Sequence, residues 1–200
     1  MIGQRIGKYR LVRKLGQGGM GVVYEAVRED IEVRAAIKVL RPEYASNAEV
    51  AGRFFNEARA ANLIAHPGIV KVFDYGHEPG GVAYLAMEYL EGESLYKRLE
   101  RVGKMAHGDV LRLGRQLASA LAAAHDKGII HRDLKPDNII IVPDAEAPGG
   151  ERTKLLDFGI AKMAAGRSAG VTTSANVLMG TPAYMSPEQC LGGKDVDGKT

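Results

Sequence analysis

Residues His131–Asn138 have the sequence His-Arg-Asp-Leu-Lys-Pro-Asp-Asn, a short stretch crowded with charged and amide side chains. Its charged and amide side chains lie between two apolar runs, Ile129–Ile130 and Ile139–Ile141. Apolar flanks anchor a polar segment to a hydrophobic core, so the pattern predicts a rigidly held polar loop. A solvated surface turn rarely carries such a density of charged groups.

A second polar element follows this loop. The β-rich run Thr153–Leu156 leads directly into Asp157-Phe158-Gly159. Together with Asn138, Asp157 offers the hard oxygen ligands that suit Mg²⁺, which keeps water and phosphate oxygens as its other ligands. An isolated Asp-Phe-Gly is more often a surface turn, but the two polar elements in this order predict a functional site.

The N-terminal part of the chain has a β pattern. Apolar residues tend to alternate from Tyr9 to Val39, with breaks at Gly16–Gly21 and Arg28–Glu32, which predicts three antiparallel strands. Two more strands are expected at Ile69–Tyr75 and Val82–Tyr89, joined by a segment rich in turn residues.

Gly16, Gly18 and Gly21 have the G-x-G-x-x-G spacing that dinucleotide-binding folds also use. In those folds a helix follows the third glycine, but residues 22–27 of this chain have a strand pattern. The loop is therefore predicted to be the tip of a hairpin, where bare backbone N–H groups can approach polyphosphate oxygens. A flexible β-turn without a ligand is the alternative.

Lys38 lies on the last of the three strands, and the next predicted element is a helix. Ser46 and Glu49 form a capping-box pattern, and apolar residues then recur at helical spacing until His66–Gly68. Glu57 falls inside this apolar stripe, where a carboxylate needs a cation. Two unit charges ~4 Å apart attract by about 4 kcal/mol at an effective dielectric constant of about 20. A Lys38–Glu57 pair is therefore a hypothesis, and a lysine that only reaches water is the alternative.

After a lobe boundary expected near Leu90–Glu93 the pattern becomes helical, which predicts one domain over residues 1–90 and another over 91–200. Ser94 is expected to cap a short helix through Val102, and Asp109 precedes a longer helix that Gly128 ends. The core-facing stripe of the longer helix consists of Val110, Leu113, Leu117, Leu121 and Ala124.

The last part of the chain combines a hairpin with a segment that lacks periodicity. Ile139–Val142 and Thr153–Leu156 predict two strands joined by a long polar tip. Residues Met163–Val177 are small and polar, which is typical of a loop that does not pack as an element.

Composition excludes several classes of protein. The 200 residues include 27 Lys plus Arg and 24 Asp plus Glu. The resulting net charge of +3 is too small to indicate a nucleic-acid-binding protein. With 46% hydrophobic residues, the chain can bury a sizeable core. The longest apolar runs are too short to span a membrane, and Met1–Leu11 lacks the apolar core of a signal peptide. Cys190 is the single cysteine, which fits a reducing, cytoplasmic setting.

The ordered set of motifs resembles the signature of eukaryotic-type protein kinases, and its style is similar to bacterial Hanks-type serine/threonine kinases. The resemblance spans Tyr9 to about Gln189. It implies an α+β, protein-kinase-like bilobal fold with a β-rich N-lobe that has one main helix and a mainly helical, incomplete C-lobe. The motifs are Gly16-x-Gly18-x-x-Gly21, Ala36-Ile37-Lys38, Glu57, His131 to Asn138, Asp157-Phe158-Gly159 and Ser186-Pro187-Glu188.

The resemblance also implies roles in ATP-dependent phosphoryl transfer to serine or threonine. Asp133 would accept the substrate proton, Lys135 would neutralise the γ-phosphate, and Lys38 oriented by Glu57 would hold the α- and β-phosphates. Asn138 and Asp157 would hold Mg²⁺, or Mn²⁺ in its place. The glycine loop would cover ATP. The adenine would be enclosed by Leu15, Val23, Ala36, Met87 and Ile140, with backbone groups of Glu88 and Leu90 on the base edge.

The implied partners are protein substrates with Ser or Thr and a second copy of the chain for autophosphorylation, with no nucleic acid and no membrane segment within residues 1–200. Arg132 precedes the proposed base, and Thr172, Thr173 and Ser174 lie in the unpatterned loop. Phosphate on one or more of these three residues is expected to pair with Arg132. Relatives of this kind often continue into a membrane anchor beyond the region matched here.

Three alternatives compete with an active serine/threonine kinase. A pseudokinase or nucleotide-binding scaffold usually lacks Lys38, Asp133, Asn138 or Asp157, and this chain retains all four. A dinucleotide-dependent oxidoreductase is disfavoured by the strand after Gly21. A tyrosine kinase is disfavoured because Lys135-Pro136 and Thr181 resemble the serine/threonine form.

If the C-lobe is incomplete, we expect uncovered apolar surface around Leu113, Leu117, Leu121, Ile129 and Ile130, a Glu188 without its arginine, and a 200-residue chain that aggregates and has little activity.

Overall fold

The computed structural model describes residues 1–45, 47–78, 81–158, 182–190 and 196–199. Contacts divide the chain into two compact units. The first unit consists of Met1–Asn62 and Lys71–Leu90, and the second consists of Leu63–Val70 and Glu91–Thr200. The segment Leu63–Val70 thus contacts mainly the second unit, although it precedes two strands of the first.

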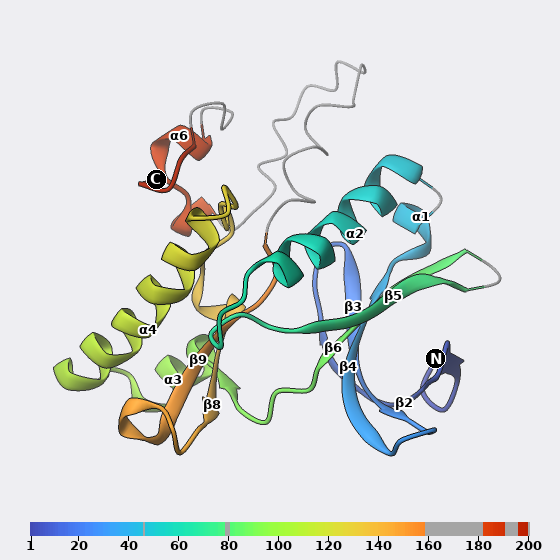
Figure 1. Ribbon diagram of the computed structural model, residues 1–200, viewed down its shortest axis with the longest axis horizontal. Helices are drawn as coiled ribbons and strands as arrows, with labels where there is room; N and C mark the ends of the chain where they lie inside the picture. Colours follow the sequence, from blue (N-terminus) through green and yellow to red (C-terminus); the bar gives the residue numbers. More distant parts are fainter. Residues whose placement is uncertain (46, 79–80, 159–181, 191–195, 200) are drawn as a thin grey trace. The chain divides into compact units, whose positions relative to one another are not determined.

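The first unit is built on a six-stranded antiparallel sheet with the order β1-β2-β3-β4-β6-β5 (Figure 1). The three strands expected between Tyr9 and Val39 are confirmed as β2, β3 and β4. The strands are β1 (Arg5–Ile6), β2 (Tyr9–Gln17), β3 (Gly21–Arg28), β4 (Val33–Leu40), β5 (Val72–Glu78) and β6 (Val82–Glu88).

The register of the sheet places the apolar core on one face and Lys38 on the other. Tyr24 lies opposite Ile37, and both belong to the hydrophobic core of the unit. Val23 lies opposite Lys38 on the other face, because neighbouring residues of a strand point to opposite sides. The apolar core therefore stabilises the sheet from one side and leaves the other face for Lys38 and its neighbours.

Helix α2 (Ala48–Leu63) follows the short helix α1 (Pro42–Ala45) and confirms the predicted helix. Ser46, the expected cap, lies outside the described residues. Asn47 has the capping role, since its Oδ1 accepts the backbone N–H groups of Glu49 at 3.0 Å and Val50 at 3.3 Å. The buried side of the helix includes Phe54, Ala58 and Glu57, as the apolar stripe indicated.

Strand β5 begins at Val72, three residues later than the sequence pattern predicts. Ile69 instead forms a parallel bridge with Leu155, and the N–H of Val70 donates to the carbonyl of Leu155 at 3.1 Å. The apolar residues Ile69 and Val70 are buried by this contact, which joins segments more than eighty residues apart in the chain. Sequence periodicity could not reveal such a pairing.

The second unit combines helices with a three-stranded sheet of order β7-β8-β9. The hairpin β8–β9 is confirmed, and so is the cap of α3, where Ser94 Oγ accepts the N–H of Lys97 at 3.2 Å. In the described part of the chain, no helix is long and apolar enough to cross a membrane. The elements are β7 (Glu93–Ser94), α3 (Leu95–Val102), α4 (His107–His125), η1 (Pro136–Asn138), β8 (Ile139–Pro143), η2 (Pro148–Gly150), β9 (Glu151–Leu155), η3 (Pro182–Tyr184) and α6 (Pro187–Cys190).

Helix α4 differs from the sequence prediction at its N-terminus. It begins at His107, so Asp109 lies in the first turn, where it pairs with Arg112 at 2.8 Å and does not act as a cap. The prediction that Val110 faces the core is wrong, because its exposure is 52%. Leu113 and Ala124 are buried, as the core-facing stripe predicts. The separate expectation that an incomplete C-lobe leaves Leu113 uncovered is therefore wrong. Leu117, Leu121, Ile129 and Ile130 are half-buried.

Candidate active site

The glycine loop is the tip of the β2–β3 hairpin, as predicted. The N–H of Gly18 donates to the carbonyl of Gly21 at 2.9 Å and closes the turn. At Gly21 a Cβ atom would lie 2.5 Å from the carbonyl oxygen of Val39, so the sheet itself requires glycine there. At Gly16 and Gly18 a Cβ would meet no atom within 4 Å, and neither residue has a positive φ. Protein packing therefore explains only the third glycine, whereas a ligand that approaches the backbone closely would explain the other two.

Arg41 fixes the tip of this loop, and the sequence analysis did not identify it. Its Nη2 donates to the carbonyl of Gly18 at 2.9 Å, and its own N–H donates to the carbonyl of Met20 at 3.0 Å. Arg41 follows β4, whereas the loop precedes β3, so only the antiparallel pairing of β3 and β4 brings them together. The loop is thus held at its tip by a side chain outside the glycine motif.

Lys38 and Glu57 form the ion pair that the sequence pattern suggested. Lys38 Nζ lies 3.4 Å from Glu57 Oε2, and the two side chains are only 13% and 9% exposed. The ammonium also lies 5.8 Å from the centre of the Phe54 ring. Because water reaches neither group well, the attraction is screened less than that of a surface pair, and it ties α2 to β4.

The candidate adenine residues of the first unit share one face of the sheet. Val23 lies opposite Lys38, Ala36 lies two residues before Lys38 on the same strand, and Met87 lies opposite Ala36. All four side chains therefore point to the same side of the sheet. Leu15, on β2, is partly exposed at 37%.

The segment after β6 is anchored by its first residues. The N–H of Glu88 donates to the carbonyl of Lys71 at 2.9 Å, and Glu88 Oε1 accepts the N–H of Lys71 at 2.8 Å. The N–H of Glu88 is therefore already used within the protein. Leu90 is half-buried at the end of the first unit.

Two arginines of the sheet, Arg13 and Arg34, hold Tyr89 in place, and the sequence analysis identified neither. The Tyr89 hydroxyl accepts from Arg13 Nη2 at 3.0 Å, and the Arg34 guanidinium lies 3.9 Å from the centre of its ring. Both arginines pair with the buried Glu25. Burial raises the pKa of the Glu25 carboxyl, but the hydrogen bond from Arg34 and the charge of Arg13 outweigh it and leave the pKa lowered.

In the second unit, Asp133 is the centre of the polar loop formed by His131–Asn138. Asn138 Nδ2 donates to the Asp133 carbonyl at 2.8 Å and to its Oδ2 at 2.9 Å, and Lys135 Nζ lies 3.6 Å from the same Oδ2. The Asp133 side chain is 9% exposed. An amide donor and a cation on the same carboxylate hold it in one orientation.

His131 connects this loop to the segment after β9. Its Nε2 lies 2.8 Å from the carbonyl oxygen of Leu156, while its Nδ1 accepts the N–H of Asp133 at 3.3 Å, so the hydrogen is assigned to Nε2. The ring also packs on Phe158, with 5.0 Å between the ring centres. Arg132 and Asp157 have positive φ angles of 60° and 43°, a strained conformation that clusters at functional sites.

Asn138 and Asp157 are brought side by side by the hairpin. The N–H of Leu156 donates to the carbonyl of Asn138 at 2.9 Å, which joins the start of β8 to the end of β9. Both hydrogen bonds of the Asn138 amide nitrogen go to Asp133, so Oδ1 is the amide atom that could hold a cation. One amide oxygen and one carboxylate fit Mg²⁺, which takes few protein ligands and keeps phosphate and water oxygens.

Gln189 on α6 contacts the polar loop that contains Asp133. Its Nε2 donates to the carbonyl of Arg132 at 2.9 Å, and its Oε1 accepts the N–H of Ser186 at 3.1 Å. A hydrogen bond from Ser186 lowers the pKa of Glu188. Burial lowers the pKa of Arg132.

The structure thus assembles the predicted residues in two sets. Lys38, Glu57 and the glycine loop lie in the first unit, and the set around Asp133 lies in the second, where Ile140 is half-buried on β8. Gly159, Thr172, Thr173 and Ser174 lie outside the described residues. No cluster of three or more His, Cys, Asp or Glu is found within the described ranges.

Comparisons with known proteins were consistent with one another. Residues 9–200 match the family described as the protein kinase domain. The serine/threonine-protein kinase pkn2 of Myxococcus xanthus is 47% identical over 188 residues, which are 94% of this chain and 22% of that protein. The serine/threonine-protein kinase PknA of Mycobacterium tuberculosis is 42% identical over 190 residues, 93% of this chain and 42% of that protein. The chain spans less than half the length of these curated relatives.

A solved structure gives the same result. The crystal structure of the Mycobacterium tuberculosis PknI kinase domain superposes with a TM-score of 0.72 at 31% sequence identity. The likeness covers 100% of this chain and 71% of that one.

Proposed function

This chain belongs to the protein kinase domain family, and we propose that it transfers the γ-phosphate of ATP to serine and threonine hydroxyls of proteins. The kinase-like α+β fold class is confirmed by the solved relatives. The observation that carries the proposed activity is the position of Asp133, which is held by Asn138 and Lys135 in one orientation. Members of this family generally use ATP and Mg²⁺.

Asp133 is proposed as the group that accepts the hydroxyl proton. Asn138 and Lys135 both contact Oδ2, so the position of the carboxylate is fixed before the substrate arrives. As the substrate oxygen bonds to the γ-phosphorus and the bond to the ADP oxygen breaks, the proton passes to Asp133. Lys135 is proposed to balance charge on the transferred group.

The remaining groups position the nucleotide. The Lys38 ammonium, held by Glu57, is proposed to contact the α- and β-phosphates, and the open backbone at Gly16 and Gly18 is proposed to cover them. Asn138 and Asp157 would hold Mg²⁺ or Mn²⁺, which offsets the charge that develops on the phosphoryl group. The adenine is proposed to contact Leu15, Val23, Ala36, Met87 and Ile140, the carbonyl of Glu88 and the backbone of Leu90.

Partners and location follow from the reaction. The acceptor is proposed to be a protein with Ser or Thr, and a second copy of the chain is proposed as one such acceptor. Residues 1–90 and 91–200 are proposed as the N-lobe and part of the C-lobe. The cytoplasm is proposed as the compartment because it supplies ATP and keeps Cys190 reduced.

The test separates phosphoryl transfer from nucleotide binding. Full-length protein is incubated with γ-phosphate-labelled ATP, Mg²⁺ and a Ser/Thr protein substrate, and nucleotide affinity is measured separately by titration. Asp133→Asn should reduce transfer by at least about a hundredfold while ATP affinity changes little, whereas Lys38→Met should weaken both.

Asp126→Asn is the matched control. It makes the same chemical change at an exposed residue just after α4, and it should retain the parent activity. Transfer by Asp133→Asn at the parent rate would contradict the assigned role. ATP binding with no transfer by the parent protein would favour a nucleotide-binding scaffold.

A further inference from the structure

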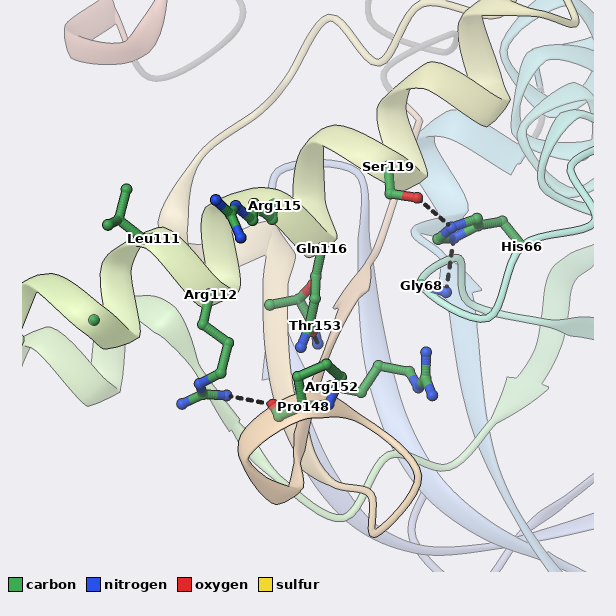
Figure 2. Close-up of a pocket in the computed structure, with 11 residues that line it drawn as sticks. His66, Gly68, Leu111, Arg112, Arg115, Gln116, Ser119, Pro148, Arg152 and Thr153 are labelled. Atoms are coloured by element: carbon green, nitrogen blue, oxygen red, sulfur yellow. Dashed lines mark hydrogen bonds between the residues drawn. The ribbon is translucent and has the colours of Figure 1, made fainter.

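The second unit has a pocket of about 460 Å³ that the catalytic residues do not line (Figure 2). Its walls come from one side of α4, from the tip and second strand of the β8–β9 hairpin, and from the segment before β5. This volume lies within the usual range of ligand pockets.

One wall is fixed by His66. Its Nδ1 accepts the N–H of Gly68 at 3.0 Å, so the hydrogen lies on Nε2, which donates to Ser119 Oγ of α4 at 3.1 Å (Figure 2). Burial lowers the pKa of His66, and the charge of Arg152 lowers it further. The ring is therefore neutral at neutral pH and holds the loop against α4.

The opposite wall is fixed just as firmly. Gln116 on α4 donates to the carbonyl of Glu151 at 2.9 Å and accepts the N–H of Thr153 at 2.8 Å. Arg112 donates to the carbonyl of Pro148 at 3.3 Å, and a Cβ at Gly149 would lie 2.6 Å from Arg112 Nε. Because these contacts are already made, an occupant would not have to order the walls, which lowers the cost of binding.

The charge of the lining is of one sign. Arg112, Arg115 and Arg152 line the pocket, and no carboxylate does. Arg112 is neutralised by Asp109 and Glu151, and Arg152 pairs with Asp144 through its Nε. The Arg115 side chain is exposed and has no hydrogen bond or ion pair with the part of the chain that the structure describes.

Leu111 offers an exposed apolar side chain near Arg115. Leu111 precedes Arg115 by four residues on α4, so the two side chains share a face of the helix, and Leu111 is 65% exposed. A Cβ at Gly108, one turn earlier, would meet no atom within 4 Å, which leaves this end of the pocket open. The pocket therefore offers a cation and an exposed apolar side chain side by side.

We propose that this pocket docks an acidic segment of the protein substrate, with a carboxylate on Arg115 and an apolar side chain on Leu111. The statement that the docked segment belongs to a substrate rests on the proposed function, whereas the binding surface itself does not. Charge complementarity selects this occupant, because a basic or neutral segment would leave Arg115 unpaired.

Binding is tested with full-length protein and a labelled peptide made of Leu, Asp, Glu and Gly, which offers no hydroxyl to phosphorylate. Arg115→Glu should weaken binding by about fivefold or more, since it replaces an attraction with a repulsion, and Leu111→Gln should weaken it also. Both residues are exposed, so unchanged thermal unfolding is expected for each variant. Lys127→Glu, an equal change of charge at an exposed residue beyond α4, should bind like the parent.

A second measurement joins docking to catalysis. A Ser-containing peptide that carries the acidic segment on a flexible linker should have a KM about fivefold lower than the same peptide with Asn and Gln in that segment. Arg115→Glu should abolish this difference without changing kcat or the KM for ATP. Equal KM values, or peptide binding that ignores both Arg115→Glu and Leu111→Gln, would overturn the proposal.

Two further outcomes are informative. Binding of a phosphoserine peptide through Arg115 more tightly than the carboxylate peptide would overturn the choice of carboxylate as ligand. Binding of the acidic peptide by a protein that transfers no phosphate to any substrate would overturn the proposed function while supporting the binding surface.

Discussion

Gly21→Ala should lower the stability of the fold, whereas Gly18→Ala should leave stability unchanged or slightly higher and weaken nucleotide binding. A Cβ at Gly21 would lie 2.5 Å from the Val39 carbonyl oxygen, a backbone atom that cannot move without disturbing the β3–β4 pairing. Overpacking of this kind costs about 1–3 kcal/mol, and the smaller entropy of the unfolded chain returns about 0.4–1 kcal/mol. The net loss is on the order of 1–2 kcal/mol.

Gly18→Ala meets no atom within 4 Å and needs no positive φ, so only the gain in the unfolded chain applies. Its melting temperature should equal or slightly exceed that of the parent. A Cβ on the loop would nevertheless obstruct close approach of phosphates, so its affinity for ATP should fall by about tenfold.

The assay is thermal unfolding by circular dichroism without nucleotide, followed by titration with a fluorescent ATP analogue and Mg²⁺. Gly21→Ala should lower Tm by roughly 2–8 °C, given about 2–4 °C per kcal/mol for a chain of this size. An unchanged Tm for Gly21→Ala would refute the packing argument. Unchanged ATP binding by a stable Gly18→Ala would refute the argument that the bare backbone serves the ligand.

Arg41→Met should raise the KM for ATP by several-fold in steady-state assays with little change in Tm, because it frees the Gly18 carbonyl at an exposed loop. Glu25, whose pKa is lowered from 4.5, contributes stability above that pH that is lost as pH falls through the folded-state pKa. Glu25→Gln should therefore lose stability at neutral pH and show a flatter acid-unfolding curve below about pH 4.5, as measured by denaturant titration. Mass spectrometry of active protein should find phosphate on Thr172, Thr173 or Ser174, and Arg132→Ala should remove its effect on activity; the absence of phosphate at all three would contradict this.

Sequence reasoning succeeded where the chemistry depends on neighbours in the chain. Within His131–Asn138 the residues that hold Asp133 are two and five positions away, and the density of polar groups between apolar flanks predicted a rigidly held loop. The Lys38–Glu57 pair could also be predicted, because a carboxylate in an apolar helical stripe requires a cation.

Local pattern failed where a residue's environment is set by a distant segment. Ile69 and Val70 have a strand pattern, but they pair with Leu155 and not with β6. Val110 has the right helical spacing for the core, yet no described element covers it. Periodicity reports that a side chain is apolar, whereas burial depends on what packs against it.

The family, the order of the elements and the groups proposed for catalysis could be predicted from the sequence, because they follow from residue types at short fixed spacings. The atoms that hold those groups in place could be identified only in the folded chain. Arg41 on the Gly18 carbonyl, Gln189 on the Arg132 carbonyl and His66 on Ser119 each join segments at least twenty residues apart. Hydrogen bonds between a side chain and a distant backbone or hydroxyl group leave no periodic signal, because they depend on geometry that exists only after the chain has folded.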